Sequence, residues 1–384
     1  MQGSWWTKLE QMDEDQKRFV RLDADGKHLL TGPPGSGKTN LIVMRARFIY
    51  GSGLKNVLVL TFTRALQDFI CTGVAEKKYL EPQQIQTFKH WALSHIALYA
   101  PHLLKSYDRD GNFETQRQQI INMLKEANQR VAGKNLYDAI LVDEVQDLHI
   151  DEVSALMHLS ERITVAGDTK QMIYDSGQTI SLLEKLNFSK TDLRYHYRIG
   201  TAIADVADRA LQPERDADRL RANSNYKEDE QQSRAELLEF PNRQSQFDAM
   251  NKTIELQLRS YPGEGIGIIV SRTFMVEELK TMFNKTPLEP LVAYHGDDAE
   301  GHSFMSGKPI HVIVLKSAKG TEFRAVHLFG LEELRFPQNR RELLFTAITR
   351  AKTALTGYYT GNILGSVATA FAKPQTPPPL ADLL

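Results

Sequence analysis

The glycine-rich stretch TGPPGSGKT, residues 31–39, restricts the fold more than any other part of this sequence. It follows KHLLTG (27–32), an apolar run typical of a buried strand, and leads into TNLIVMRARFIY (39–50), which has a helical pattern. A loop of the form GxxxxGKT between a strand and a helix is typical of phosphate-binding loops, in which backbone N–H groups and the helix N-terminus hold the phosphates. The alternative is a chance glycine-rich turn, which would have no reason to lie between a buried strand and a helix.

The side chains of this loop predict ATP and Mg²⁺ as ligands. Lys38 would reach the β- and γ-phosphates, and the hydroxyl group of Thr39 would bind Mg²⁺. We expect the loop residues to bind ATP as a group: Gly32, Pro33, Pro34, Gly35, Ser36, Gly37, Lys38, Thr39 and Asn40.

The acidic stretch LVDEVQDL, residues 141–148, supplies the second half of such a site. Asp143 and Glu144 end an apolar run, where a Mg²⁺-associated carboxylate and a base that activates water are expected. Two acids placed at a strand end for solubility are the weaker alternative once a phosphate loop lies upstream. The two motifs together predict ATP hydrolysis, but many molecular machines share them, so they leave open what work the ATP drives.

Short apolar runs alternate with helical patterns along most of the chain. Further strands are expected at 56–62, 137–144, 162–168, 235–240, 266–271, 290–295, 310–315 and 325–330. This alternation favours an α/β fold with parallel sheets, in which ligands bind at the carboxyl ends of the strands. We predict two domains, residues 1–190 and 191–372, with a small helical insertion at 89–136, a charged loop of disordered-type composition at 213–234 and a proline-rich tail at 373–384.

The composition excludes several classes of protein. The 384 residues include 47 basic and 48 acidic ones, so any basic track for nucleic acid must be local. Cys71 is the only cysteine, and no apolar run reaches the ~20 residues of a membrane span, so we expect a cytoplasmic protein without disulfides or membrane contact. The arm around Trp5 and Trp6 and the proline-rich tail are places for a partner protein; a hydrophobic anchor and a frayed terminus are the alternatives.

Several later motifs are weak singly but specific in their order: GDTKQMIY (167–174), YHYR (195–198), LKSAKGTEF (315–323) and FTAITRAK (345–352). With the phosphate loop, LTFTRA (60–65), QTFKHWA (86–92) and VDEVQD (142–147), they resemble the successive motifs of UvrD/Rep-type superfamily 1 DNA helicases. The resemblance covers about residues 13–360. It implies two tandem RecA-like P-loop domains with ATP in the cleft between them, and a single strand of DNA, or of RNA, crossing both.

The resemblance also implies roles for individual residues around the nucleotide. Gln16 would recognise adenine, Tyr197 would pack on it, and Glu322 would bind the ribose. Gln146 and Asp147 would mark the coupling between the domains and the strand. The implied catalytic residues include a γ-phosphate sensor and two arginines from the second domain, which gives Lys38, Glu144, Gln171, Arg198 and Arg350.

The nucleic-acid contacts implied by the resemblance lie at or beside the same motifs. They are Thr61, Phe62, Thr63, Arg64, Thr87, Tyr174 and Lys316. Aromatic rings there would stack on bases, and the polar groups would contact phosphates. A core position for each aromatic side chain and a solvated face for each polar one are the alternatives.

The chain departs from the family pattern in three ways. Lys89 and Lys316 stand where the family usually has histidine, and no tryptophan follows Tyr174. The spacing between motifs also leaves little room for the large accessory domain of full-length relatives. We expect an ATP-dependent single-stranded DNA translocase or helicase that moves 3′→5′. The alternative is a nucleotide-gated switch that binds nucleic acid and controls a partner, such as a nuclease, without processive unwinding.

Overall fold

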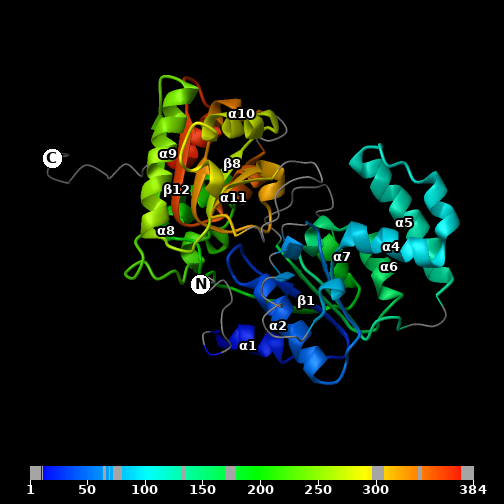
Figure 1. The fold of residues 1–384 in the computed structure, drawn as a ribbon. Coiled ribbons are helices and arrows are strands. Elements are labelled where there is room, and N and C mark those ends of the chain that lie inside the picture. The colour runs from blue at the N-terminus through cyan, green and yellow to red at the C-terminus, as the bar shows by residue number, and fades with distance from the viewer. Residues whose placement is uncertain are drawn as a thin grey trace.

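The computed structural model describes residues 10, 12–63, 66–68, 70–71, 80–131, 135–168, 179–295, 307–335 and 340–372. Within these ranges the chain forms two α/β domains, each built on a six-stranded sheet (Figure 1). All the strand pairs of both sheets are parallel. The tandem α/β architecture expected from the sequence is confirmed.

The first sheet has the strand order β3-β2-β4-β5-β1-β6. Leu29 of β1 packs into the core on one face of this sheet and its neighbour Leu30 into the core on the other, so both faces are covered. The strands are β1 (Lys27–Thr31), β2 (Val57–Thr61), β3 (Ile85–Thr87), β4 (Ala139–Val142), β5 (Ile163–Gly167) and β6 (Ser189–Asp192). The helices of this domain are α1 (Glu14–Val20), α2 (Lys38–Gly51), α4 (Phe88–Tyr99), α5 (Phe113–Gln129), α6 (Ile150–Met157) and α7 (Thr179–Lys185).

The second sheet has the order β7-β12-β11-β8-β10-β9 and is likewise buried on both faces. Its strands are β7 (Arg234–Glu239), β8 (Ile266–Val270), β9 (Val292–His295), β10 (Ile310–Val314), β11 (Phe323–Leu328) and β12 (Ala351–Tyr359). The helices are α8 (Thr201–Leu211), α9 (Arg243–Ser260), α10 (Phe274–Phe283), α11 (Arg341–Ile348) and α12 (Gly365–Phe371).

The segment between β3 and β4 is helical and extends outward from the first sheet (Figure 1). Trp91 of α4 and Leu124 of α5 are buried in the same core cluster as Leu156 of α6. The helical segment is therefore held by the core of the first domain and does not form a separate one.

Three strands were not expected from the sequence. β3 has three residues, and the edge strand β6 consists of the mostly exposed residues SKTD, so neither has the apolar run of a buried strand. β12 has nine residues but follows α11 almost directly, begins in the last two residues of the motif FTAITRAK and contains Gly357, and these features hide the strand pattern in the sequence. Because β6 crosses position 190 and pairs with β1, we propose the domain boundary just after Asp192.

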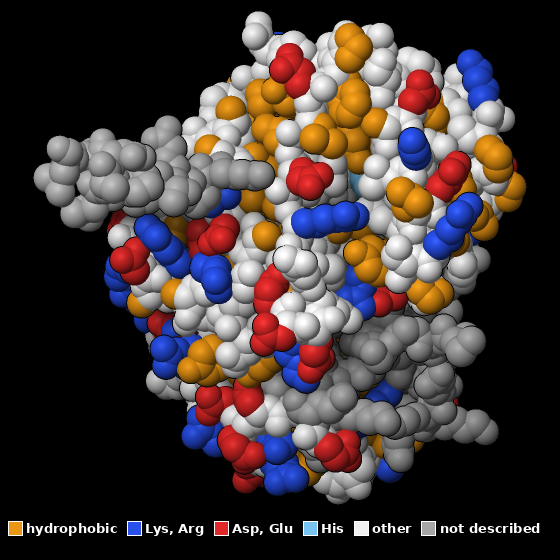
Figure 2. Space-filling model, turned by 90° about the vertical axis from the view of Figure 1, so that its left-hand side faces the viewer, with side chains coloured by type: hydrophobic (Ala, Val, Ile, Leu, Met, Phe, Trp, Pro, Cys, Tyr) orange, Lys and Arg blue, Asp and Glu red, His pale blue; other side chains and the backbone are white. Residues whose placement is uncertain are grey.

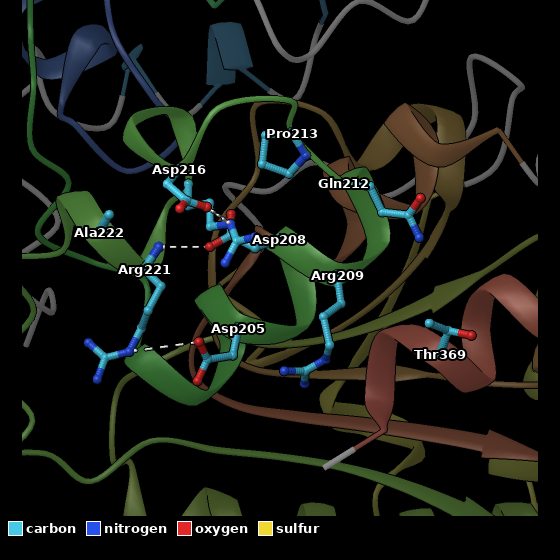
Figure 3. A pocket seen from close by; sticks show the side chains of 10 residues that line it. Asp205, Asp208, Arg209, Gln212, Pro213, Asp216, Arg221, Ala222 and Thr369 are labelled. Carbon is cyan, nitrogen blue, oxygen red and sulfur yellow. Dashed lines mark hydrogen bonds and ion pairs between the residues drawn. The ribbon is translucent and has the colours of Figure 1, made fainter. Parts of the chain in front are cut away.

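The charged loop at 213–234 has a defined course, contrary to its disordered-type composition. The Asp208 carboxylate of α8 accepts hydrogen bonds from the backbone N–H groups of Leu220 (2.7 Å) and Arg221 (2.9 Å). Arg221 also lies 3.7 Å from Asp205, and Asp205, Asp208 and Arg221 line a pocket (Figure 3). Leu220 is almost fully buried, so an apolar side chain and the Asp208 carboxylate both hold the turn against α8.

The surface seen in Figure 2 carries acidic and basic side chains interspersed with one another. In the described part of that face no large patch of a single charge is seen, which agrees with the balanced composition. Any contact with a nucleic-acid backbone on this side must therefore depend on single, well-placed cations.

Candidate active site and nucleic-acid contacts

The phosphate loop spans the carboxyl end of β1 and the start of α2. Gly37, at the N-cap of α2, has a φ of 89°, a left-handed conformation that favours glycine. The Lys38 ammonium donates hydrogen bonds to the carbonyl oxygens of Gly32 (2.8 Å) and Pro33 (3.0 Å). The buried hydroxyl of Ser36 has no hydrogen-bond partner among the described residues. A buried cation and an unsatisfied donor in a glycine-rich loop suit a phosphate group.

Thr39 and Asp143 meet at the next strand. The Thr39 hydroxyl donates to an Asp143 carboxylate oxygen at 2.6 Å, so the two oxygen donors expected for Mg²⁺ lie side by side. Burial, and then the adjacent charge of Glu144, raise the pKa of Asp143 to about 7. A divalent cation would favour the ionised carboxylate, so the donor set fits the metal.

Glu144 is held in an unusual backbone conformation at the end of β4. Its φ of 56° is in the left-handed region, which is uncommon for a residue with a side chain and is found at functional sites. The Gln146 side chain donates a hydrogen bond to the Glu144 carboxylate and accepts one from the backbone N–H of Asp168 at 3.0 Å. Gln146 therefore ties the candidate base to the end of β5.

Asp147 joins the two domains. Its carboxylate lies 2.7 Å from the ammonium of Lys319, which follows β10 in the second domain, and both side chains are buried. The same ammonium is 3.6 Å from Glu144. Burial raises the pKa of Glu144, but the positive charges around it, that of Lys319 first, outweigh burial and lower it. Burial also raises the pKa of Asp147 to about 6, and Lys319 opposes this rise.

Lys319 had no role assigned from the sequence. The motif LKSAKGTEF marks this segment, but nothing in the linear order shows that its lysine reaches the acidic motif of the other domain. The available signal was the position of a lysine just after a buried strand, because carboxyl ends of parallel strands are where ligands and partner residues gather.

Arg350 and Arg198 are the two arginines that the resemblance assigns to the γ-phosphate, and the hydrogen bonds of both side chains are with residues of the second domain. Arg350 is buried at the end of α11, and its guanidinium donates to the carbonyl oxygens of Thr346 (2.9 Å) and Thr321 (3.2 Å). Burial lowers the pKa of Arg350, and the negative charge of Glu144 is the largest effect that opposes this shift.

Arg198 forms an ion pair with Glu322, and Lys352 lies 3.7 Å from the same carboxylate. Burial raises the pKa of Glu322, but the charges of Arg198 and Lys352 outweigh burial and lower it. The structure thus brings together Arg198, which was expected at the γ-phosphate, and Glu322, which was expected at the ribose.

The predicted adenine contacts converge beside the phosphate loop. The Gln16 amide donates to the carbonyl oxygen of Ser36 at 2.9 Å, and Asp13 caps α1 on the same side. The Tyr197 hydroxyl donates to Asp13, and its backbone N–H donates to the carbonyl oxygen of Gly35 at 3.2 Å. Asn40 is buried in the first turn of α2, and Pro34 lies in the loop itself.

The predicted nucleic-acid contacts have different surroundings. Lys316 is exposed after β10, and Phe62 is partly exposed after β2. Thr61 is buried and donates to the carbonyl oxygen of Thr63 at 3.1 Å, whereas the Thr87 hydroxyl accepts from His90 N–H (3.3 Å) and caps α4. Thr63 accepts from the Leu66 N–H group at 3.3 Å. Three predicted site residues lie outside the described ranges, and these are Arg64, Gln171 and Tyr174.

The chain has two α/β domains, each with an all-parallel sheet. The first domain carries a phosphate loop, and buried cations of the second domain lie beside the acidic motif of the first. This arrangement defines a tandem RecA-like P-loop ATPase. A family model described as an AAA domain matches residues 16–177, and a model of the UvrD-like helicase C-terminal domain matches residues 309–356. The chain therefore contains both ATPase domains of the superfamily 1 helicase type, which are domains of ATP-hydrolysing enzymes.

Comparison with solved structures adds one example. The structure of PRRSV helicase is similar, with 16% sequence identity and a TM-score of 0.43, over 90% of this chain and 54% of that one. This chain therefore spans about half the length of that helicase. A search of curated proteins found no match. In the described part of this chain, none of the helices is long and apolar enough to cross a membrane.

Proposed function

We propose that this protein is an ATP-dependent translocase or helicase that moves 3′→5′ along single-stranded DNA. The observation that carries the proposal is the buried ion pair between Lys319 and Asp147, beside Glu144. The two carboxylates belong to the first domain and the ammonium to the second. Relative movement of the domains would therefore change the charge around the candidate base, which is the coupling that a motor requires.

The residues of the cleft have separate tasks in this proposal. Thr39 and Asp143 would hold Mg²⁺, which supplies positive charge to the phosphates of ATP. Lys38 would bind the β- and γ-phosphates, and Glu144, oriented by Gln146, would accept the proton of the attacking water. Arg198 and Arg350 would stabilise the charge of the transferring phosphoryl group, with Gln171 as the predicted γ-phosphate sensor.

We infer the path of the nucleic-acid strand from residues at the carboxyl ends of the β-strands in both sheets. Phe62 follows β2 and Lys316 follows β10, each at the carboxyl end of its sheet. One chain of nucleotides crossing both domains would meet an aromatic ring for a base and a cation for a phosphate. The choice of DNA and the 3′→5′ direction rest on the resemblance of GDTKQMIY and the neighbouring motifs to the UvrD/Rep type.

Strand displacement tests this proposal most simply. Duplexes with a 3′ or a 5′ single-stranded tail are mixed with the protein, ATP and Mg²⁺, and the released strand is measured. Displacement from 3′-tailed duplexes alone is expected. Displacement from 5′-tailed duplexes alone would reverse the direction, and a preference for RNA tails would change the substrate.

A second candidate is a nucleotide-gated switch that binds a single strand and controls a partner protein. It is favoured by the region from β7 to β12, whose described residues contribute the strands and helices of the second sheet and form no further large domain. The partner would bind through the N-terminal arm or the proline-rich tail; residues 1–9 and 373–384 lie outside the described ranges. ATP-dependent strand binding without movement or displacement would favour this switch.

A further inference from the structure

A second charged pocket lies beside the phosphate loop. Its volume is about 310 Å³, and Gly32, Pro33 and Asp168 are among the residues that line it. All three are close to the Lys38 ammonium, which donates to the carbonyl oxygens of Gly32 (2.8 Å) and Pro33 (3.0 Å) and lies 3.8 Å from Asp168. The pocket therefore begins next to the cation expected at the γ-phosphate.

Two separate parts of the chain form the sides of this pocket. One side is the carboxyl ends of β1 and β6 with the residues that follow them, where the backbone N–H of Leu193 donates to the carbonyl oxygen of Thr31 at 2.7 Å. The other side is the charged loop at 213–234, which Asp208 holds against α8 of the second domain. Movement of the second domain relative to the first would therefore change the width of the pocket.

The acidic residues that line the pocket are matched by cations. Three acids lie beside three cations, and the distances are 3.8 Å from Asp168 to Lys38, 3.1 Å from Asp192 to Lys190 and 2.8 Å from Asp218 to Arg215. Two further cations, Arg194 and Arg219, also line the pocket. The lining residues therefore carry an excess of positive charge, which suits an anion.

Arg194 and Arg219 are held only weakly in their present positions. Arg194 is exposed, and its guanidinium lies 5.1 Å from the centre of the Tyr195 ring. Arg219 lies 3.1 Å from Asp216, in a pair whose side chains are 54% and 88% exposed. Exposed ion pairs contribute little free energy, so both guanidinium groups can exchange these contacts for the oxygens of a phosphate.

The expected adenine contacts lie at the other end of the phosphate loop. Gln16 donates to the carbonyl oxygen of Ser36, and the backbone N–H of Tyr197 donates to that of Gly35. The pocket is lined by Gly32 and Pro33, at the start of the loop. An ion released next to Lys38 could therefore leave through the pocket while ADP remains bound.

We propose that inorganic phosphate binds in this pocket as it leaves the active site ahead of ADP, with Arg194 and Arg219 as its ligands. The volume far exceeds the ~30 Å³ that one water occupies in the liquid, so the ion fits together with several waters. No bond is made or broken there, because the phosphate has already been formed from ATP and water. The inference rests on the proposed function, since domain movement would link phosphate release to the motor.

Single-turnover kinetics separate this exit step from the chemistry. Rapid quench measures cleavage of ATP, and a fluorescent phosphate-binding protein measures free phosphate. Arg194→Glu should cleave ATP at the wild-type rate but release phosphate about 10-fold more slowly, because the reversed charge repels the anion. Arg219→Glu should delay release from the opposite side of the pocket, whereas Arg194→Lys, which keeps the charge, should release phosphate nearly as fast as the wild type.

Arg221→Glu is the matched control. Arg221 belongs to the same loop, but its side chain lies beside Asp205 and lines the neighbouring pocket (Figure 3). Its charge reversal should leave both rates unchanged, and an equal delay in this variant would overturn the proposal.

Two other results with Arg194→Glu would also contradict the exit route. Equal slowing of cleavage and release would show that Arg194 only supports the structure of the active site. Normal cleavage with unchanged or faster release would show that phosphate does not leave past Arg194. If the wild type cleaved no ATP, the proposed function itself would fail, which is a separate outcome.

Discussion

The ammonium of Lys319 lies 2.7 Å from the carboxylate of Asp147, in the interior, although the two residues belong to different domains. A buried ion pair is costly to break from one side, because the remaining charge stays without its counterion. Glu144 is 3.6 Å from the same ammonium, so the pair also sets the charge around the candidate base. The domain contact and the chemistry therefore share one cation.

This pair can be tested by a double-mutant cycle. Lys319→Gln and Asp147→Asn should each destabilise the protein by about 3 kcal/mol or more. The double variant should be less destabilised than the sum, by about 1–3 kcal/mol, since neither residue then leaves an unpaired charge. Chemical denaturation of the four proteins gives the interaction energy, and strictly additive effects would contradict the contact.

Lys38→Ala should abolish ATP turnover, because the phosphates lose their cation while the backbone of the loop is unchanged. Lys55→Ala, at an exposed lysine after α2, is the matched control and should turn over ATP like the wild type. Steady-state hydrolysis and a thermal melt of each variant are measured. Wild-type turnover in a folded Lys38→Ala protein would remove the phosphate-loop assignment.

Glu144→Gln should slow hydrolysis by ~10²–10⁴ while ATP and single-stranded DNA still bind, because the amide keeps the shape of the side chain and cannot accept the proton. Rapid-quench single turnover is compared with equilibrium binding of ATP. Equal losses in binding and hydrolysis would mean that Glu144 holds the structure of the site and is not the base.

Arg350→Ala and Arg198→Ala should each reduce single-turnover hydrolysis far more than they reduce affinity for an ATP analogue. The reason is that an arginine aimed at the transferring phosphoryl group acts mainly in the transition state. Arg259→Ala, at an exposed position on α9, serves as the control. Normal hydrolysis in both cleft variants would be incompatible with catalysis between two domains.

Acid should destabilise the second domain through His327. The ring is fully buried between Tyr358 (2.9 Å) and Gln257 (2.8 Å), and burial, with the nearby charge of Arg234, lowers its pKa to about 3. The unfolded chain, with a histidine pKa of about 6.5, therefore binds more protons than the folded one between these values. Stability from this group is full above pH ~6.5 and falls by roughly 1.4 kcal/mol per pH unit below it.

Denaturant unfolding at pH 7 and pH 5 measures this slope. His327→Gln should make the slope shallower, even though it lowers stability at pH 7, because the titrating group is gone. An unchanged slope in His327→Gln would assign the acid sensitivity to other groups.

The sequence predicted the features that depend on short-range patterns. The phosphate loop lies between β1 and α2 as expected, and the apolar runs at 57–61 and 139–142 are strands of one sheet. Order of motifs was also sufficient to indicate that Arg198 and Arg350 come from the second domain. These features follow from periodicity and from residue types that few other sites require.

The sequence could not show contacts that depend on tertiary structure. Lys319 and Asp147 are 172 positions apart, and no local pattern pairs a lysine with one acid among several. Arg194 and Arg219 look like ordinary surface charges until the fold places them on two sides of one pocket. The edge strand β6 is mostly exposed and polar, so its sequence lacks the apolar run that predicts a buried strand. Its place in the sheet depends on backbone pairing with β1, which the sequence does not show.

The rate of ATP hydrolysis as a function of single-stranded DNA concentration tests the central claim most directly. If a strand crossing both domains closes the cleft around ATP, the rate should rise several-fold and reach half of its maximum at the concentration that half-saturates DNA binding. Lys319→Gln should bind the strand and lose most of the stimulation. A wild-type rate that stays constant while the strand demonstrably binds would contradict the coupling of nucleic acid to hydrolysis.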